Sequence, residues 1–280
     1  MAEKRISKEP LLVEMLNNPL EIYHLLNRSN CMDCHEKTCM AFAVAVFKNK
    51  RRLQECPHLS PEILHRYGDE TRRPNTIDED MAAAVENRKN RIKRLDLSEA
   101  ARRLEADFDN TLLTLRVFGR DVSVDPNGNL ITDIHVNPWI AAPLLDYILE
   151  GRGGKPTGKW MNFRELKGGL VRSAHFRQRC EQPLKQIADM YPELFTDLLE
   201  IFDGKRTDSP MRMDICIVLQ PLPLVPMLIG YWYPEEELES SLHILFDEAV
   251  QDNLAIDSLY TLCEGIVMMF GKIARRHGER

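Results

Sequence analysis

Four cysteines give the most specific chemical signal in this chain of 280 residues. They are Cys31, Cys34, Cys39 and Cys56, and their spacing is C-x2-C-x4-C-x16-C. Three thiolates on one tight loop can converge on a single centre, and a helix after the third cysteine returns the chain so that the fourth closes the site. Pro57 follows the last cysteine directly, which is typical of iron–sulfur ligation because proline ends the helix without a competing N–H. We therefore predict that these four residues bind an iron–sulfur cluster.

Two other metal chemistries fit part of this pattern. Zinc also accepts thiolates, but structural zinc sites usually use two C-x2-C pairs, and the second half of this pattern holds one cysteine. Residues 31–35 read C-x-x-C-H, the attachment motif of a c-type haem, which would leave Cys39 and Cys56 without a role. Both alternatives stay open behind the iron–sulfur interpretation. The other three cysteines are interpreted as small buried apolar residues: Cys180, Cys216 and Cys263.

The cysteine segment resembles a known module. Residues 29–43 read S-N-C-x-x-C-x-x-x-T-C-M-A-F-A and residues 55–57 read E-C-P, which is similar to the small [4Fe–4S] module of corrinoid iron–sulfur protein large subunits. A related module occurs in electron-transfer subunits of membrane complexes. The resemblance covers about residues 25–62 and implies the same four cysteine ligands. His35 stands where that family commonly has glycine, so we expect its ring N–H either to donate to a cluster sulfur and raise the reduction potential or to face water.

Composition and charge exclude several classes of protein. With 44% apolar and 29% charged residues, the chain has enough apolar side chain to fold, and a net charge of −6 argues against a general nucleic-acid binder. The polar N-terminus matches no signal peptide, and prolines interrupt the longest apolar tract, residues 216–233, so no membrane span is expected. We expect a cytoplasmic protein with reduced thiols and with neither nucleic acid nor membrane as a partner.

The sequence predicts three parts: a cluster module over residues 1–76, a charged helical linker over 77–110 and a mixed domain over 111–280. In the module, helices are expected over residues 9–28 and 40–53. In the domain, alternating apolar residues predict a hairpin over 113–124. Further strands are expected over residues 129–135, 160–163, 215–219, 227–233 and 243–246, and helices over 138–150, 176–190, 193–202 and 256–275. Because strands and helices follow no strict βαβ order, the predicted fold class is α+β.

The mixed domain carries a resemblance of its own. Four motifs, G-K-W-M-N-F-R-E-L-x-G-G at 158–169, H-F at 175–176, P-x-P-x-x-P at 221–226 and L-F-D at 245–247, resemble the domain-of-unknown-function 3786 family. The resemblance covers about residues 111–270 and implies no activity. Residues 153–159 approximate a phosphate-binding P-loop, but Trp160 stands where serine or threonine should hold magnesium and a helix is expected before the loop, so we reject that reading.

Three histidines lie in or beside apolar segments of the domain: His135, His175 and His243. Their surroundings favour buried, hydrogen-bonded core groups. If the domain holds a tetrapyrrole, a corrinoid or a haem, these are the candidate axial ligands. No pairing of nucleophile and base, and no pair of carboxylates, is spaced closely enough to nominate a catalytic residue.

These observations predict an electron-transfer protein or redox partner with one [4Fe–4S] cluster. Its expected partner is a redox protein, with a corrinoid or other tetrapyrrole protein of anaerobic metabolism suggested by the resemblance. Two alternatives stay open. The domain itself binds a tetrapyrrole and reduces it with cluster electrons, or the cluster is a redox sensor or structural clip that controls partner binding.

Overall fold

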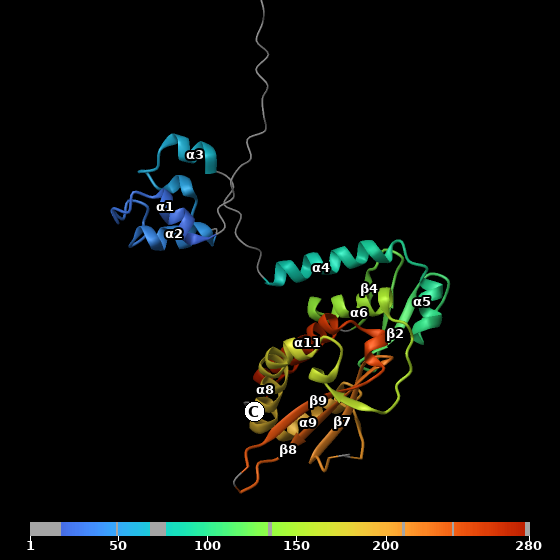
Figure 1. Cartoon of the computed structure of the whole chain (residues 1–280). Coiled ribbons are helices and arrows are strands. Elements are labelled where there is room, and N and C mark those ends of the chain that lie inside the picture. Colours follow the sequence, from blue (N-terminus) through green and yellow to red (C-terminus); the bar gives the residue numbers. More distant parts are fainter. Residues whose placement is uncertain are drawn as a thin grey trace, which may run out of the picture. The chain divides into compact units, whose positions relative to one another are not determined.

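The computed structural model describes residues 18–48, 50–67, 77–133, 136–208, 211–236 and 238–277, with the side chains of all of these except 65 and 66. Two compact units make up the chain, Met1–Thr76 and Ile77–Arg280 (Figure 1). Within the described residues, no helix is both long and apolar enough to cross a bilayer.

The first unit is small and helical. Asn18 begins α1 (Pro19–Leu25), since its side-chain oxygen accepts from the backbone N–H of Glu21 at 3.0 Å. The expected helix over residues 9–28 is thus seen from residue 19, and its first half lies outside the described residues. The other elements of the unit are α2 (Cys39–Phe47), the 3-10 turn η1 (Leu53–Glu55) and α3 (Pro61–Tyr67). The predicted 40–53 helix is therefore split, with α2 ending at Phe47 and a separate 3-10 turn before Cys56.

The second unit is built on two antiparallel sheets. One has the order β1-β2-β3-β4, from β1 (Asp107–Phe108), β2 (Leu113–Val117), β3 (Arg120–Val124) and β4 (Leu130–Ile131). The other has the order β5-β9-β8-β7-β6, from β5 (Trp160–Asn162), β6 (Lys205–Arg206), β7 (Ile215–Leu222), β8 (Val225–Trp232) and β9 (Ser241–Asp247). The predicted hairpin over 113–124 is confirmed, with Val117 opposite Arg120. Its two turn residues, Phe118 and Gly119, have φ of 49° and 72°, the pattern of a tight type I′ turn.

Helices pack with both sheets into one hydrophobic core, which confirms the predicted α+β class. The expected helices over 138–150 and 256–275 are present as α6 (Pro138–Glu150) and α11 (Ile256–His277). The remaining helices are α4 (Ile77–Ile92), α5 (Leu97–Leu104), α7 (Ser173–Phe176), α8 (Gln182–Met190), α9 (Pro192–Ile201) and α10 (Val250–Asn253). Short 3-10 turns η2 (Phe163–Glu165) and η3 (Leu170–Arg172) and the π-turn η4 (Arg177–Glu181) connect them.

Residues 77–110 are not set apart as a linker in this structure. They form α4, α5 and β1 of the second unit, and Val85 and Ile92 of α4 lie in its main core. α4 lies alongside α6 (Figure 1). The sequence of α4 does not indicate this packing clearly, because its apolar stripe is narrow and most of its charged residues are solvated.

A buried ion pair fixes α4 on α6. The Arg88 guanidinium donates from Nε and Nη2 to the two carboxylate oxygens of Asp146, at 2.7 and 2.8 Å. The Asp146 side chain is only 6% exposed and also accepts from the Ser258 hydroxyl of α11 at 2.7 Å. One carboxylate thus joins three helices, and its burial makes the arginine necessary.

We predict that Arg88→Met lowers the free energy of unfolding of the second unit by about 2–4 kcal/mol, because Asp146 stays buried with one donor left. The matched control is Arg91→Met on the same helix. Arg91 pairs with Glu150 of α6 at 2.7 Å, but both side chains are nearly half exposed, so the loss should stay below about 1 kcal/mol.

Denaturant unfolding followed by tryptophan fluorescence measures this difference. All three tryptophans lie in the second unit, so the signal reports that unit alone. Equal destabilisation by the two variants would contradict a special role for the buried pair.

Candidate metal centre

Two of the four predicted ligands, Cys31 and Cys34, lie on the loop that joins α1 to α2, and a third, Cys39, is the first residue of α2. The loop curls tightly because several residues other than glycine adopt left-handed backbone conformations, with φ between 52° and 64°: Arg28, Asn30, Met32 and His35. The backbone N–H of His35 donates to the Met32 carbonyl at 2.9 Å and closes a turn around Cys34. The predicted convergence of closely spaced cysteines thus has a specific backbone basis.

Cys39 is held at the first turn of α2. Thr38 caps the helix, since its hydroxyl accepts from the Ala41 N–H at 3.0 Å. Asn30 makes two hydrogen bonds to Cys39. Its side-chain oxygen accepts from the Cys39 backbone N–H at 2.8 Å, and its backbone N–H donates to the Cys39 sulfur at 3.4 Å. The backbone N–H groups of this helix end favour negative charge on the neighbouring sulfurs. Asn30 stands within the cysteine motif, but the cysteine spacing alone does not indicate this positioning role.

The position of Cys56 relative to the cysteine loop is set by the 3-10 turn η1 and by ion pairs of Arg51. The Cys56 N–H donates to the Leu53 carbonyl at 3.2 Å and ends the 3-10 turn. Arg51 reaches Glu36 in the cysteine loop at 3.4 Å and Glu55 beside Cys56 at 3.1 Å. Arg51 thus links the two segments that carry the cysteines, although Cys39 and Cys56 are 17 positions apart in the sequence.

The structure brings the four cysteines together. Cys34, Cys39 and Cys56 are 6–7% exposed and share one hydrophobic cluster, whereas Cys31 is exposed. Burial raises the pKa of the Cys56 thiol, and the charges of the other three cysteines raise it further. An all-thiol donor set of this kind fits a thiophilic metal centre, whose positive charge would offset the repulsion among the thiolates.

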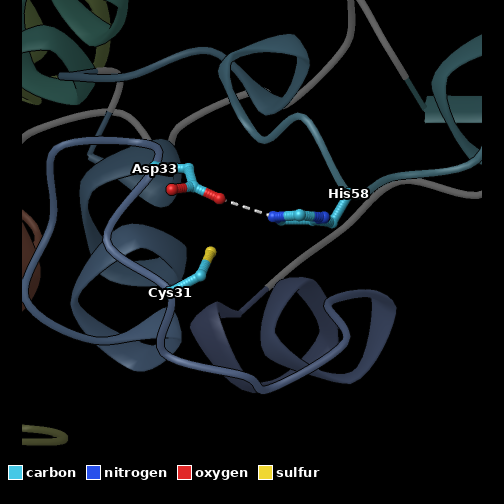
Figure 2. A group of neighbouring side chains, drawn as sticks. All are labelled: Cys31, Asp33 and His58. Atoms are coloured by element: carbon cyan, nitrogen blue, oxygen red, sulfur yellow. Dashed lines mark hydrogen bonds and ion pairs between the residues drawn. The ribbon is translucent and has the colours of Figure 1, made fainter.

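Two further side chains lie at the exposed edge of the site. Figure 2 shows Asp33 from the cysteine loop and His58 from the segment after Cys56, both near Cys31. The His58 Nε2 and Asp33 Oδ2 atoms are 2.7 Å apart. Hydrogen bonds from His58 and, second, from the Cys31 thiol lower the pKa of Asp33. Neither residue was expected from the cysteine spacing, because Asp33 and His58 are 25 positions apart in the sequence.

The predicted histidines fall in different places. His35 is exposed and left-handed, and whether its ring acts on a bound cluster stays a prediction. His135 lies outside the described residues. His175 on α7 and His243 on β9 are both exposed, so the expectation that they are buried core groups was wrong. His243 lies 3.5 Å from Glu181 and edge-on to Trp232, and neither it nor His175 lines the cavities of about 300 and 460 Å³ in the second unit.

The other three cysteines are buried as predicted. Burial is the main cause that raises the pKa of the thiols of Cys180 and Cys263, both within the core of the second unit. Such thiols stay protonated and are poor metal ligands and nucleophiles.

The backbone N–H groups of residues 153–159, the segment that approximates a P-loop in sequence, donate to side chains of the same unit. The N–H groups of Thr157 and Gly158 donate to the Asp247 carboxylate at 3.0 and 2.6 Å. Those of Gly153 and Gly154 donate to the side-chain oxygen of Asn253 at 3.0 and 2.9 Å. Internal acceptors therefore occupy the donors that a phosphate would need.

Fold and site together define a two-unit protein with a small cysteine-rich metal-binding unit followed by an α+β domain. Comparison with known sequences agrees. Residues 26–58 match the family described as "Putative Fe-S cluster". Residues 96–269, well over half of the chain, match the family described as "Domain of unknown function (DUF3786)", and the chain belongs to that family.

The first unit is similar to part of the gamma subunits of acetyl-CoA decarbonylase/synthase complexes. Identity is 43% over 47 residues with subunit gamma 1 of Methanosarcina thermophila, covering 17% of this chain and 10% of that protein. It is 42% over 41 residues with subunit gamma of Methanothermobacter thermautotrophicus, covering 15% and 9%. This chain thus spans about a tenth of the length of these curated relatives. No solved structure matches the chain.

We predict that Cys56→Ala removes most of the iron and sulfide from anaerobically purified protein, because the fourth thiolate closes the site. Cys180→Ala is the matched control, since it also removes one buried thiol but from the other unit, and it should keep its metal. Iron and acid-labile sulfide per chain give the answer, and full metal content in the Cys56 variant would refute four-cysteine ligation.

A separate prediction concerns the left-handed backbone at His35. Glycine adopts φ near 62° without the Cβ clash that costs other residues about 1 kcal/mol. His35→Gly should therefore slow the loss of bound iron to a chelator about fivefold, and His35→Ala should not, because it keeps the Cβ.

The same pair of variants isolates the imidazole. If the ring donates a hydrogen bond to a cluster sulfur, both substitutions lower the reduction potential by about 30 mV, equivalent to roughly 0.7 kcal/mol. Unchanged reduction potentials in both variants would show that the His35 ring donates no hydrogen bond to a cluster sulfur.

Proposed function

We propose that Cys31, Cys34, Cys39 and Cys56 bind one [4Fe–4S] cluster and that the protein serves in the cytoplasm as an electron carrier or redox partner. The observation that carries this proposal is that Cys34, Cys39 and Cys56 lie buried in one hydrophobic cluster, while the exposed Cys31 precedes Cys34 by three residues on the same loop. The sequence likeness of residues 26–58 to an iron–sulfur family supports it.

The pattern of donors favours a cluster over a single zinc ion. Structural zinc sites usually take their thiolates from two C-x2-C pairs, whereas here Cys56 stands alone as the fourth cysteine. Pro57 directly after it is typical of iron–sulfur ligation.

The uneven burial of the ligands suits electron transfer. When bound, the cluster supplies one-electron chemistry. Cys34, Cys39 and Cys56 shield three sides with apolar neighbours, and the exposed Cys31 leaves one edge at the surface where an electron can pass to a partner. We propose that this partner is a redox protein carrying a corrinoid or another tetrapyrrole. The likeness to gamma subunits of acetyl-CoA decarbonylase/synthase complexes supports that class of partner for the first unit alone.

Anaerobically purified protein should show a broad absorption shoulder near about 400 nm that bleaches on reduction, with about four iron and four sulfide per chain. The reduced protein should then transfer one electron to a corrinoid protein in the cob(II)alamin state, seen as the corrin spectrum of the reduced cobalt. A stoichiometric zinc content without sulfide would overturn the cluster. A normal cluster that reduces no corrinoid or haem partner would leave the cluster and overturn the tetrapyrrole link.

A further inference from the structure

The site has one corner unlike the other three. Cys34, Cys39 and Cys56 lie in the hydrophobic cluster of the first unit, against apolar residues such as Phe42 and Leu53. At the fourth corner, Cys31 is exposed, with the Asp33 side chain 52% and the His58 side chain 41% exposed. A sulfur, a carboxylate and an imidazole thus meet at the surface edge (Figure 2).

These three groups are close enough to share a metal atom. The Cys31 sulfur, an Asp33 carboxylate oxygen and a His58 ring nitrogen all lie within 4.8 Å of one another. A metal–thiolate bond is about 2.3 Å long, so an iron atom on the Cys31 sulfur comes within a small side-chain rotation of the carboxylate. Carboxylates and imidazoles are both ordinary ligands of iron.

We propose that Asp33 is an exchangeable ligand for the iron atom that Cys31 binds, and that His58 is the positioning residue that holds its carboxylate ready. This inference rests on the proposed cluster. In the exchange, a carboxylate oxygen of Asp33 would replace the Cys31 sulfur on the same iron atom. The Cys31 sulfur would keep the electron pair of the broken bond as a thiolate, so no atom changes oxidation state.

The geometry favours Asp33 over His58 as the ligand. Asp33 lies inside the ligand loop between Cys31 and Cys34, and one of its carboxylate oxygens lies within 4.8 Å of the Cys31 sulfur. His58 Nε2 contacts Oδ2 at 2.7 Å, which leaves the other carboxylate oxygen for the metal. A carboxylate held through one oxygen by a histidine is a recurrent way of orienting a ligand.

The test compares full-length variants after anaerobic purification, with iron, sulfide and Mössbauer spectra as readouts. Cys31→Ala should keep roughly half or more of its [4Fe–4S] cluster, with one iron site showing oxygen ligation. The Cys39→Ala variant, which lacks a buried ligand, should contain about tenfold less cluster than the unsubstituted protein. Asp33→Asn alone should keep the cluster, because Cys31 then serves as the ligand.

The double variants identify the ligand. Cys31→Ala with Asp33→Asn should lose the cluster about tenfold relative to Cys31→Ala, whereas Cys31→Ala with His58→Gln, which keeps an N–H donor, should retain it. In the Cys31→Ala background, His58→Ala should weaken cluster retention and broaden the spectrum of the oxygen-ligated iron.

Several results would overturn the assignment. Loss of the cluster in Cys31→Ala, or its conversion to a three-iron form, would show that nothing replaces the thiolate. Retention in the Cys31→Ala, Asp33→Asn protein together with loss in the Cys31→Ala, His58→Ala protein would assign the ligand to His58 instead. Absence of a four-iron cluster from the unsubstituted protein would contradict the proposed function itself, which separates that failure from this one.

Discussion

The first unit depends on one constraint: its proposed metal ligands are also part of its core. Cys34, Cys39 and Cys56 pack in the same hydrophobic cluster as Ile22, Phe42 and their neighbours. A core of this size supplies little stability alone, so small domains commonly gain theirs from a metal. Three buried thiolates without a cation would repel one another where the dielectric is low. Metal binding and folding of this unit are therefore coupled, in the manner of other small metal domains.

The second unit has a different basis for stability. Its core includes residues from both sheets and from the helices α4, α6 and α11, and the Arg88–Asp146 pair joins the three helices through one buried carboxylate. The two units thus differ in what holds them together: buried cysteines form part of the core of the first, whereas apolar side chains and a buried ion pair stabilise the second.

The sequence predicted the features that depend on local spacing. The hairpin around Gly119 and the helix from Pro138 to Glu150 appear where alternation and capping signals placed them. The cysteine spacing also led us to expect that these residues lie close together, and Cys34, Cys39 and Cys56 do share one hydrophobic cluster. What it missed depends on contacts between distant residues. Arg88 looked like one more solvated charge on α4 until Asp146, 58 positions later, was found buried opposite it. His243 looked like a core residue because apolar residues flank it, yet in a strand alternate side chains face opposite sides, and it faces solvent.

The loop backbone and the exposed corner have a common physical origin. To bring three cysteines within nine residues around one centre, the chain adopts left-handed conformations on both sides of Cys31, at Asn30 and Met32. These conformations cost energy for residues other than glycine, and Asn30 offsets part of that cost by two hydrogen bonds to Cys39. Cys31 has no such support: it is exposed, and the neighbour that the turn brings to it is the carboxylate of Asp33. The curvature that gathers the thiols therefore also places an oxygen donor beside the least buried of them, so the distinct corner follows from the turn itself.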